Sequence, residues 1–386
     1  MNQPARIVGV EAIPVLVRGQ REFRISEGFA DSHTSVVLRI VTDQPGLEGF
    51  GEAVSAPPGK PEEFAEEIVG AVDRYVAPAL IGLNVGERRA GRARVEKALK
   101  GRIWTKAAVD VALHDLHAKA LGVPLTDLLG GRLMDEVPVI GPVIGMAAPD
   151  VMARIAAGQA RAGFAAVKIK IGETIAADLA RVIAVREAIG PGVRMRVDAN
   201  DHYRPADAVT LVRAIERYDI EHVEQPVPRG DLLGMAELRR AVGVPICSDD
   251  AVATPRDAMT LARLGAASRV KVKVSKHGLE GAALIIGMLE AAGVGCVLGH
   301  VFQMGLASLA EAQLAACASN LIAPHEIGSL AAIGADTDIV SNRLRPRPGV
   351  FRLADGPGLG AEIDWVAIER CRTDMAGRAR SPMTPA

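Results

Sequence analysis

Six charged side chains recur along the chain at intervals that match the repeat of a parallel α/β fold. They are Lys168, Lys170, Asp198, Glu224, Asp249 and Lys273. Each lies near the end of a short apolar or β-branched run, and a strand with its crossover helix needs about this much chain. If the runs are parallel strands of one closed sheet, all six meet at its carboxyl end, where barrel enzymes hold their chemistry. Three carboxylates between lysines predict a metal-assisted proton-transfer site.

The two lysines of residues 167–171 alternate with three β-branched residues. Alternation sends Lys168 and Lys170 to one face of a strand and the β-branched residues to the other, where helices pack. The non-functional alternative is a pair of surface lysines on an edge strand, with their alkyl chains lying along the protein surface. A closed parallel sheet has no such edge, so we favour lysines that point into the barrel mouth.

The three carboxylates Asp198, Glu224 and Asp249 end consecutive predicted strands. A single carboxylate at such a point is more often a helix N-cap or an ion-pair partner. Three together would repel one another, which predicts a divalent cation, and all-oxygen ligation favours Mg²⁺ or Mn²⁺ over zinc. Asp250 points away from Asp249 if the strand continues and is expected to support the site, whereas Lys271 is expected in a deeper ion pair.

Strands and helices alternate from about residue 137 onward. The predicted strands are 137–143, 166–171, 193–197, 220–223, 244–247, 270–274, 294–298 and 321–323. Eight strands alternating with helices predict an α/β fold, a (β/α)8 TIM-like barrel, over residues 131–345. Before it, residues 1–130 predict an α+β capping domain with strands at 35–41 and 47–53 and helices at 61–77 and 105–121. Residues 346–386 are expected to return to the cap.

Composition excludes several classes of protein. The 386 residues are 49% hydrophobic and 24% charged, with a formal net charge of −1. This charge offers no field for nucleic acid or an anionic membrane. Four widely spaced cysteines without a C-x-x-C pair indicate free thiols in a reducing compartment. No signal peptide and no apolar membrane span is evident, so we expect a cytoplasmic homo-oligomer that acts on a small carboxylate.

Five motifs occur in order at barrel spacing: the K-x-K pair, D-A-N from Asp198, E-Q-P from Glu224, S-D-D ending at Asp250, and Lys273. Together they resemble the enolase superfamily, in particular the muconate lactonizing enzyme (muconate cycloisomerase) subgroup of the mandelate racemase/muconate lactonizing enzyme family. The resemblance extends to GFGEA at 49–53, to residues 108–131 and to PGLGAEID at 357–364.

The resemblance implies roles for the charged residues. Asp198, Glu224 and Asp249 would bind Mg²⁺, with Mn²⁺ as a substitute. Lys170 and Lys273 would be acid/base groups on opposite faces of the substrate, and Lys168 would help to neutralise the substrate carboxylate. The His–Asp dyad of the mandelate racemase subgroup is absent, because Val270 stands at the position of its aspartate.

Four further residues are candidates for substrate binding: Arg24, Asn200, His300 and Gln303. Arg24 lies in the cap segment 22–29, which corresponds to the lid of this family and would let it meet a distal anion; the alternative is a solvent-exposed hairpin. Gln303 stands where the lactonizing subgroup carries an acidic residue, which weakens transfer of the muconate reaction. His300 is either a site residue or a structural histidine at a strand end whose ring nitrogens are hydrogen-bonded within the protein. Residues 323–326 lack the Asp-x-Asp of dipeptide epimerases, which argues against a dipeptide substrate.

The chemistry follows from charge. Removing the proton next to a carboxylate creates an enolate, and a cation on the carboxylate stabilises that charge more than it stabilises the ground state. The base must be a neutral lysine; Lys168 and the metal should lower the pKa of Lys170, and the carboxylates should oppose this.

These features predict a Mg²⁺-dependent cycloisomerase that makes or opens a lactone of an unsaturated dicarboxylate through a metal-stabilised enolate. On the same site, the alternatives are a racemase or epimerase of an N-acyl or cyclic amino acid and an acid dehydratase. A Schiff-base aldolase using a strand-end lysine and a non-catalytic binding barrel are weaker alternatives.

Overall fold

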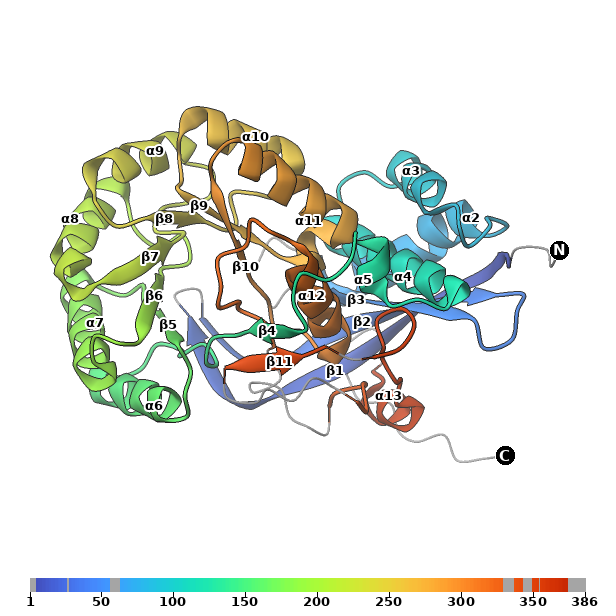
Figure 1. The fold of residues 1–386 in the computed structure, drawn as a ribbon, viewed down its shortest axis with the longest axis horizontal. Helices are drawn as coiled ribbons and strands as arrows, with labels where there is room; N and C mark the ends of the chain where they lie inside the picture. The colour runs from blue at the N-terminus through green and yellow to red at the C-terminus, as the bar shows by residue number, and fades with distance from the viewer. Residues whose placement is uncertain are drawn as a thin grey trace.

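The computed structural model of the chain describes residues 5–25, 28–55, 63–328, 337–342, 349–353 and 355–373. A ring of alternating strands and helices packs beside a long antiparallel sheet (Figure 1). That sheet has the order β1-β2-β3 and comprises β1 (Ile7–Ile25), β2 (Gly28–Thr42) and β3 (Glu48–Val54). Both predicted cap strands lie within β2 and β3, whereas β1 was not predicted.

Six parallel strands in sequential order form most of the barrel wall. They are β5 (Ala166–Lys170), β6 (Arg194–Asp198), β7 (Ile220–Glu224), β8 (Ile246–Ser248), β9 (Arg269–Val272) and β10 (Gly295–Leu298). Isolated parallel bridges close the ring: Ile144 with Ile169, Val139 with His325, and Cys296 with Leu321. The predicted (β/α)8 barrel is therefore confirmed.

The first and eighth predicted strands form less regular structure than expected. Residues 139–144 and 321–325 make only isolated bridges, and β4 (Glu136–Pro138) pairs antiparallel with β11 (Val350–Arg352) instead. Pro142 and Pro324 lie in these segments. Because proline has no backbone N–H, it removes ladder hydrogen bonds where a regular strand needs them.

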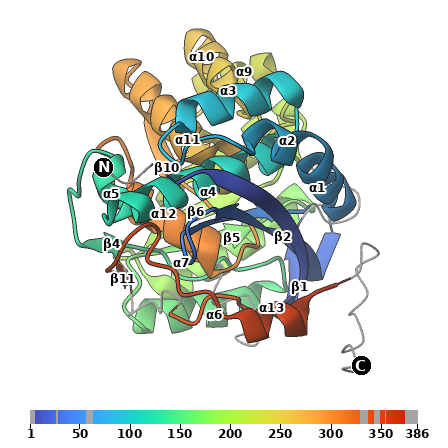
Figure 2. The same cartoon turned by 90° about the vertical axis from the view of Figure 1, so that its right-hand side faces the viewer.

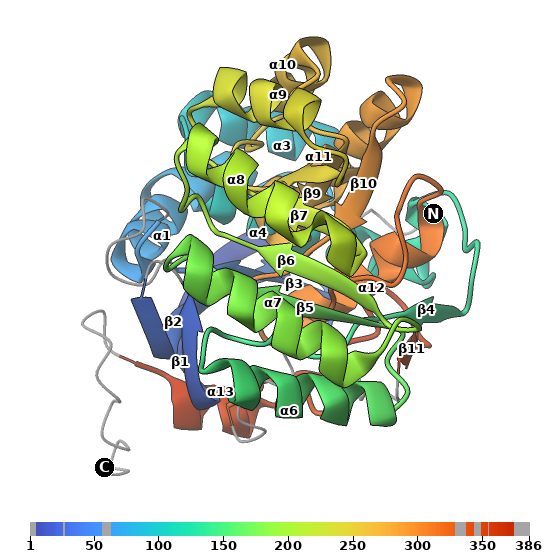
Figure 3. The ribbon, with the colours of Figure 1, turned by 90° about the vertical axis from the view of Figure 1, so that its left-hand side faces the viewer.

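Helices cover the outer face of the barrel strands (Figure 3). They are α6 (Pro149–Arg161), α7 (Ile175–Ile189), α8 (Pro205–Ile215), α9 (Leu232–Ala241), α10 (Pro255–Leu264), α11 (Val274–Ala291) and α12 (Gly305–Cys317). The β-branched residues of β5, Val167 and Ile169, are fully buried in this layer. Their burial leaves the other face of the strand for Lys168 and Lys170, as the alternation predicted.

The cap adds helices to its sheet. They are α1 (Ala65–Ala71), a π-helical turn (Val72–Val76), α2 (Ala77–Leu80), α3 (Arg88–Ala98), α4 (Ile103–Leu121) and α5 (Leu125–Leu128). The helix predicted at 105–121 is α4, which ends at Gly122 with φ 71°. The start predicted at Pro61 lies outside the described residues. No helix in the described ranges combines the length and apolar character needed to span a membrane.

The cap docks on α12 through a buried carboxylate. Glu52 of β3 accepts hydrogen bonds from the backbone N–H groups of Met304 (2.8 Å) and Ala307 (3.2 Å). The first N–H groups of a helix have no partner within the helix, so this cap carboxylate completes the N-terminus of a barrel helix. Burial raises the pKa of Glu52 to about 7. The helix that follows β10 is therefore held by the cap.

A second cap carboxylate binds α11 directly after the kink at Gly278, where the helix starts again. Asp110 of α4 accepts hydrogen bonds from the N–H groups of Leu279 (2.6 Å) and Glu280 (3.0 Å). The backbone of Gly278 is left-handed there, with φ 69°, and a Cβ at this position would lie 2.7 Å from the Asp110 carboxylate. Glycine thus permits the approach of α4 to α11, which Figure 2 shows side by side. The cap therefore contacts both α11, which follows β9, and α12, which follows β10.

Residues 365–373 of the C-terminal segment lie against the cap sheet. The N–H of Thr373, just after α13 (Trp365–Cys371), donates to the carbonyl of Pro14 at 3.1 Å. The Trp365 ring packs edge-on against Phe50 of β3, with centroids 6.1 Å apart. The domain boundaries at residues 130 and 345 stay a prediction.

The contact between β3 and α4 gives a test of cap packing. A Cβ on Gly51 would lie 2.1 Å from the carbonyl oxygen of Ala108, so Gly51→Ala forces the two elements apart. We expect a loss of about 1–3 kcal/mol or more in unfolding free energy. Gly158→Ala in α6 is the control, because nothing lies within 4 Å of its Cβ and alanine favours a helix by about 1 kcal/mol. Urea unfolding curves that coincide for Gly51→Ala and wild type would contradict this packing.

Candidate active site

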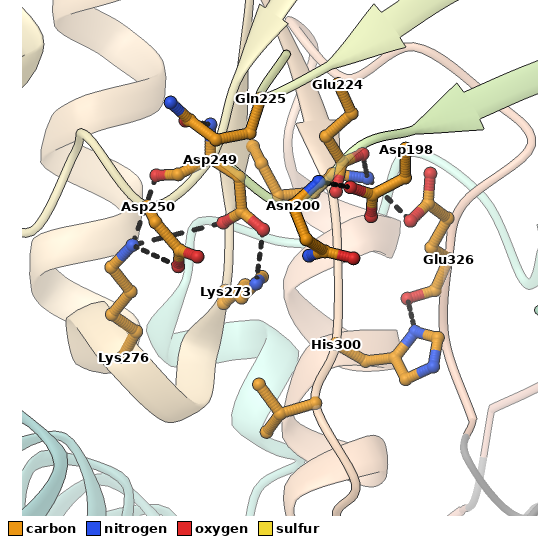
Figure 4. Close-up of polar contacts among 12 residues, drawn as sticks. Asp198, Asn200, Glu224, Gln225, Asp249, Asp250, Lys273, Lys276, His300 and Glu326 are labelled. Carbon is orange, nitrogen blue, oxygen red and sulfur yellow. Dashed lines mark hydrogen bonds and ion pairs between the residues drawn. The ribbon is translucent and has the colours of Figure 1, made fainter. Parts of the chain in front are cut away.

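The predicted charged residues lie at the carboxyl ends of consecutive barrel strands. Lys168 and Lys170 are on β5, Asp198 ends β6 and Glu224 ends β7. Asp249 and Lys273 directly follow β8 and β9. Figure 4 shows that the three carboxylates and Lys273 point toward a common region. Strand order therefore places a lysine-bearing strand on each side of the three carboxylate strands.

Each of the two proposed acid/base lysines is paired with a different carboxylate. The Lys170 Nζ lies 2.6 Å from Asp198 Oδ2 and also donates to Asn200 Oδ1 at 2.7 Å. The Lys273 Nζ lies 2.6 Å from Asp249 Oδ2. Both ammonium groups thus lie beside the carboxylate cluster, as the strand spacing predicted.

A charge network continues deeper in the barrel. The Lys168 Nζ lies 2.7 Å from Glu224 Oε1, 2.9 Å from Asp198 Oδ2 and 2.9 Å from Glu326 Oε2. Lys271 is fully buried, and its Nζ lies 2.6 Å from Glu224 Oε2 and 2.5 Å from Glu326 Oε2. The expected deeper ion pair of Lys271 is thus present, and it shares both partners with Lys168.

Glu326 is the residue that sequence reasoning missed. Its other oxygen, Oε1, accepts a hydrogen bond from the guanidinium of Arg196 at 3.1 Å, and Arg196 also donates to Glu221 at 2.6 Å. The signal for Arg196 was available, because it alternates with Asp198 on one strand and must share its inward face. Glu326 had no such signal, since the eighth strand is irregular.

The surroundings push the pKa values of the two acid/base lysines in opposite directions. Burial lowers the pKa of Lys170, and the charge of Lys168 adds to this, against the opposing effect of Asp198. The sequence argument named the lowering effect of Lys168 and the opposing effect of the carboxylates on the pKa of Lys170, but not the larger effect of burial. For Lys273, burial also works to lower the pKa, but Asp249 and Asp250 outweigh it and raise the pKa.

The carboxylates differ from one another as well. Burial works to raise the pKa of Asp198, yet Lys168 and Lys170 hold it well below the ordinary value. For Glu224, burial and the neighbouring charge of Asp198 raise the pKa to about 7. Glu224 is therefore the carboxylate of the three whose negative charge its surroundings compensate least.

The donor chemistry of the three carboxylates fits a hard divalent cation. Asp249 Oδ1 is buried and accepts no hydrogen bond; Glu224 Oε2 also lacks an aligned donor, although Lys271 Nζ is near. Carboxylate oxygens are the ligands that Mg²⁺ and Mn²⁺ prefer. Taken together, the three carboxylates do not bring one oxygen each to within 4.8 Å of one another, so ligation of one ion by all three would require their side chains to move.

In the described part of the chain, the ligand atoms that do lie within 4.8 Å of one another belong to His222, Glu224 and Cys247. This set would suit zinc by atom type. However, Arg269 Nη1 lies 3.0 Å from His222 Nδ1. Because a guanidinium can only donate, Nδ1 is the acceptor and the ring proton is on Nε2. A metal at Nε2 would force an N–H against Arg269, so this group is unsuited to a metal.

The four predicted substrate-binding residues have different surroundings. Asn200 is buried, and its side chain accepts from Lys170 as described above. His300 is partly exposed, and its Nδ1 lies 2.8 Å from the carbonyl of Glu326, which makes Nδ1 the donor. Gln303 is fully buried. The carbonyl of Arg24 accepts from Met146 N at 2.8 Å, while part of the predicted lid, 26–27, lies outside the described residues. Their substrate contacts stay a prediction.

Comparison with known proteins places this architecture in one class. Residues 9–130 match the family described as mandelate racemase / muconate lactonizing enzyme, N-terminal domain, and residues 150–367 match the enolase C-terminal domain-like family. The chain is 32% identical over 361 residues to L-Ala-D/L-Glu epimerase of Bacillus subtilis (strain 168), covering 92% of this chain and 96% of the relative. It is 32% identical over 379 residues to muconate cycloisomerase 1-2 of Acinetobacter lwoffii, covering 96% of each.

The fold agrees with a solved relative. The dipeptide epimerase from Enterococcus faecalis V583, complexed with Mg and the dipeptide L-Leu-L-Tyr, superposes with a TM-score of 0.86 at 29% identity, covering 92% of this chain and 99% of that one. The class defined by fold and site is a capped (β/α)8-barrel enzyme with acidic and lysine residues at the strand ends. The chain belongs to the enolase superfamily, in its muconate lactonizing enzyme subgroup, and is an isomerase of that superfamily.

The buried network predicts a large effect of removing one cation. Lys271→Met removes one of the two buried ammonium groups that Glu224 and Glu326 share and leaves Lys168 as the only lysine between them, so we expect a loss of about 3–5 kcal/mol in unfolding free energy. Lys100→Met is the matched control, since the exposed Lys100 ammonium donates only to a backbone carbonyl, and its expected change is within about 0.5 kcal/mol. Urea unfolding of both variants measures the difference. Equal stabilities would show that the network contributes little.

Proposed function

We propose that this isomerase uses a bound Mg²⁺ and two lysines to move a proton at the carbon next to a carboxylate. The observation that carries the proposal is the pairing of Lys170 with Asp198 and of Lys273 with Asp249, on either side of Glu224. A proton donor and a proton acceptor can thereby face one substrate carbon from two directions. The Mg²⁺ of the E. faecalis relative supports the choice of ion.

Asp198, Glu224 and Asp249 are the residues that would hold the ion. Bound Mg²⁺ supplies positive charge where the substrate carboxylate gains negative charge. With that charge supplied, Lys170 and Lys273 would no longer be needed as counter-charges to Asp198 and Asp249. Lys168 and Lys271 remain beside Glu224 to limit the net charge of the site.

Lys170 and Lys273 then divide the proton transfer. One lysine, in its neutral form, takes the α-proton with its Nζ lone pair, and the other, as an ammonium, delivers a proton. Asn200 orients Lys170 through the 2.7 Å hydrogen bond from Nζ. Either lysine can begin, because microscopic reversibility exchanges their roles between the two directions of the reaction.

Two reactions use this pair. Racemisation or epimerisation of an N-acyl or cyclic amino acid needs both lysines, because the proton leaves one face and returns to the other. Cycloisomerisation of an unsaturated dicarboxylate needs one acid/base group at the carbon that changes. The two-sided placement favours inversion, whereas the similarity to muconate cycloisomerase 1-2 supports cycloisomerisation. Acid dehydration stays a third possibility on the same residues.

Residues 323–326, in the eighth strand segment, bear on which kind of amino-acid derivative the site would accept. The similarity to dipeptide epimerases supports epimerisation. Residues 323–326, however, carry Ala-Pro-His-Glu, and Glu326 is bound to Lys168, Lys271 and Arg196. A carboxylate already shared by three cations is poorly suited to bind a dipeptide ammonium group. We therefore favour a substrate whose nitrogen is acylated or part of a ring.

Isotope exchange separates these reactions. With Mg²⁺ in D₂O, wild type is expected to place deuterium on the α-carbon of both enantiomers of an accepted amino-acid derivative. Lys170→Ala and Lys273→Ala are each expected to lower turnover by about 10²- to 10⁴-fold, and each should retain exchange with only one enantiomer. Mass spectrometry and chiral chromatography give the readout, and thermal unfolding controls for the fold. Exchange of both enantiomers by either variant would contradict the two-lysine proposal.

Metal removal tests the second half of the proposal. Dialysis against EDTA is expected to abolish the α-proton exchange, because the negative charge that develops on the substrate then lacks its counter-charge, and Mg²⁺ or Mn²⁺ should restore it. A Schiff-base aldolase would instead survive EDTA and be inactivated by borohydride in the presence of a carbonyl substrate. Full exchange after EDTA would exclude the metal-dependent route.

A further inference from the structure

Gln225 directly follows Glu224 and has an unusual backbone. Its φ is +36°, in the left-handed region that side-chain-bearing residues other than asparagine and aspartate seldom adopt. It is also fully buried. Strained backbone persists only where the surrounding contacts determine it, and such positions concentrate at functional sites. The contacts of Gln225 must therefore hold its backbone in this conformation.

On one side Gln225 is bound to the end of β8. Its N–H donates to the carbonyl of Cys247 at 2.8 Å, and its side-chain Oε1 accepts from the N–H of Asp249 at 2.8 Å. The N–H of Ala251 approaches the same oxygen at 3.4 Å. The amide group is held in this orientation because its Nε2 donates to the carbonyl of Val227 at 2.9 Å. Figure 4 shows Gln225 directly beside Asp249.

On the other side Gln225 is bound to the loop that follows β6. Its carbonyl accepts from the N–H of Asp201 at 2.9 Å, and the carbonyl of Glu224 accepts from the N–H of Ala199 at 3.1 Å. Ala199 and Asp201 lie one and three residues after Asp198. One residue thus connects the strand ends that carry Asp198, Glu224 and Asp249.

We propose that Gln225 is a positioning residue that sets the spacing of the three carboxylates, and that its Oε1 bond to the N–H of Asp249 is the main determinant. The proposal rests on the proposed function, in which these carboxylates bind one divalent ion. The strained φ is what lets the peptide groups on both sides of Gln225 face opposite neighbours. A residue that only filled space would not need four hydrogen bonds to three separate segments. Supporting contacts of this kind typically change metal affinity by 10- to 100-fold.

Gln225→Met tests the proposal, because it keeps the length of the side chain and removes both of its hydrogen-bonding groups. The measurement is Mn²⁺ affinity by calorimetry and by the electron paramagnetic resonance signal of free Mn²⁺, which requires no substrate. We expect the affinity to fall at least tenfold relative to wild type. Lys170 and Lys273 are unchanged, so no acid/base group is removed.

Gln313→Met is the matched control. Gln313 is also buried, and its side chain also bonds backbone groups: it accepts from Thr126 N at 3.1 Å and donates to the carbonyl of Leu359 at 2.8 Å. It lies in α12, away from the carboxylates. We expect similar losses of thermal stability for both variants but a loss of Mn²⁺ affinity for Gln225→Met alone. Equal Mn²⁺ affinities in the two variants would overturn the positioning role.

Two further outcomes keep the inference separate from the proposed function. If wild type binds no Mn²⁺, the proposed function fails, and with it the premise of the inference. If Gln225→Met does not fold, Gln225→Glu takes its place, since it keeps an acceptor for the Asp249 N–H while it replaces the donor to Val227 by a second, negatively charged oxygen. Its affinity should then stay within tenfold of wild type, and a greater loss would overturn the assignment of the Asp249 bond as the determinant.

Discussion

Charge balance inside the barrel is the constraint on which the rest of the structure depends. Burying a carboxylate lowers the stability of the folded state unless the carboxylate has a partner. In the low-dielectric interior, an unpaired charge destabilises the fold more than an apolar side chain in its place would. Here Asp198, Glu224 and Asp249 are compensated by lysines that come from the flanking strands. Under the proposed function, a dication bound at these carboxylates would free Lys170 and Lys273 for proton transfer.

The supports of the site come from three directions. Gln225 connects the ends of neighbouring strands by hydrogen bonds, and Glu326 forms ion pairs with both Lys168 and Lys271. The cap contributes from outside, where Glu52 binds the N-terminus of α12 and Asp110 binds α11 after its kink at Gly278. Strand-end residues are therefore placed by contacts that lie mostly outside the strands themselves.

Much of this organisation could be predicted from the sequence, because regular spacing and strict alternation carry it. The β-branched residues of β5 imposed the direction of Lys168 and Lys170, and the repeat interval implied the barrel. What escaped prediction lacks a periodic signal: β1 is a long strand of mixed polarity, and the bonds of Gln225 and Glu326 join residues more than 20 positions apart. The first and eighth strands were misjudged because prolines interrupt their hydrogen bonding.

Anomalous diffraction from a crystal grown with Mn²⁺ tests the central claim most directly. The account predicts one strong peak bounded by carboxylate oxygens of Asp198, Glu224 and Asp249, with the ammonium groups of Lys170 and Lys273 turned from these acids toward the space above the ion. A map without a peak among the three carboxylates, or with its peak beside His222 and Cys247, would contradict it.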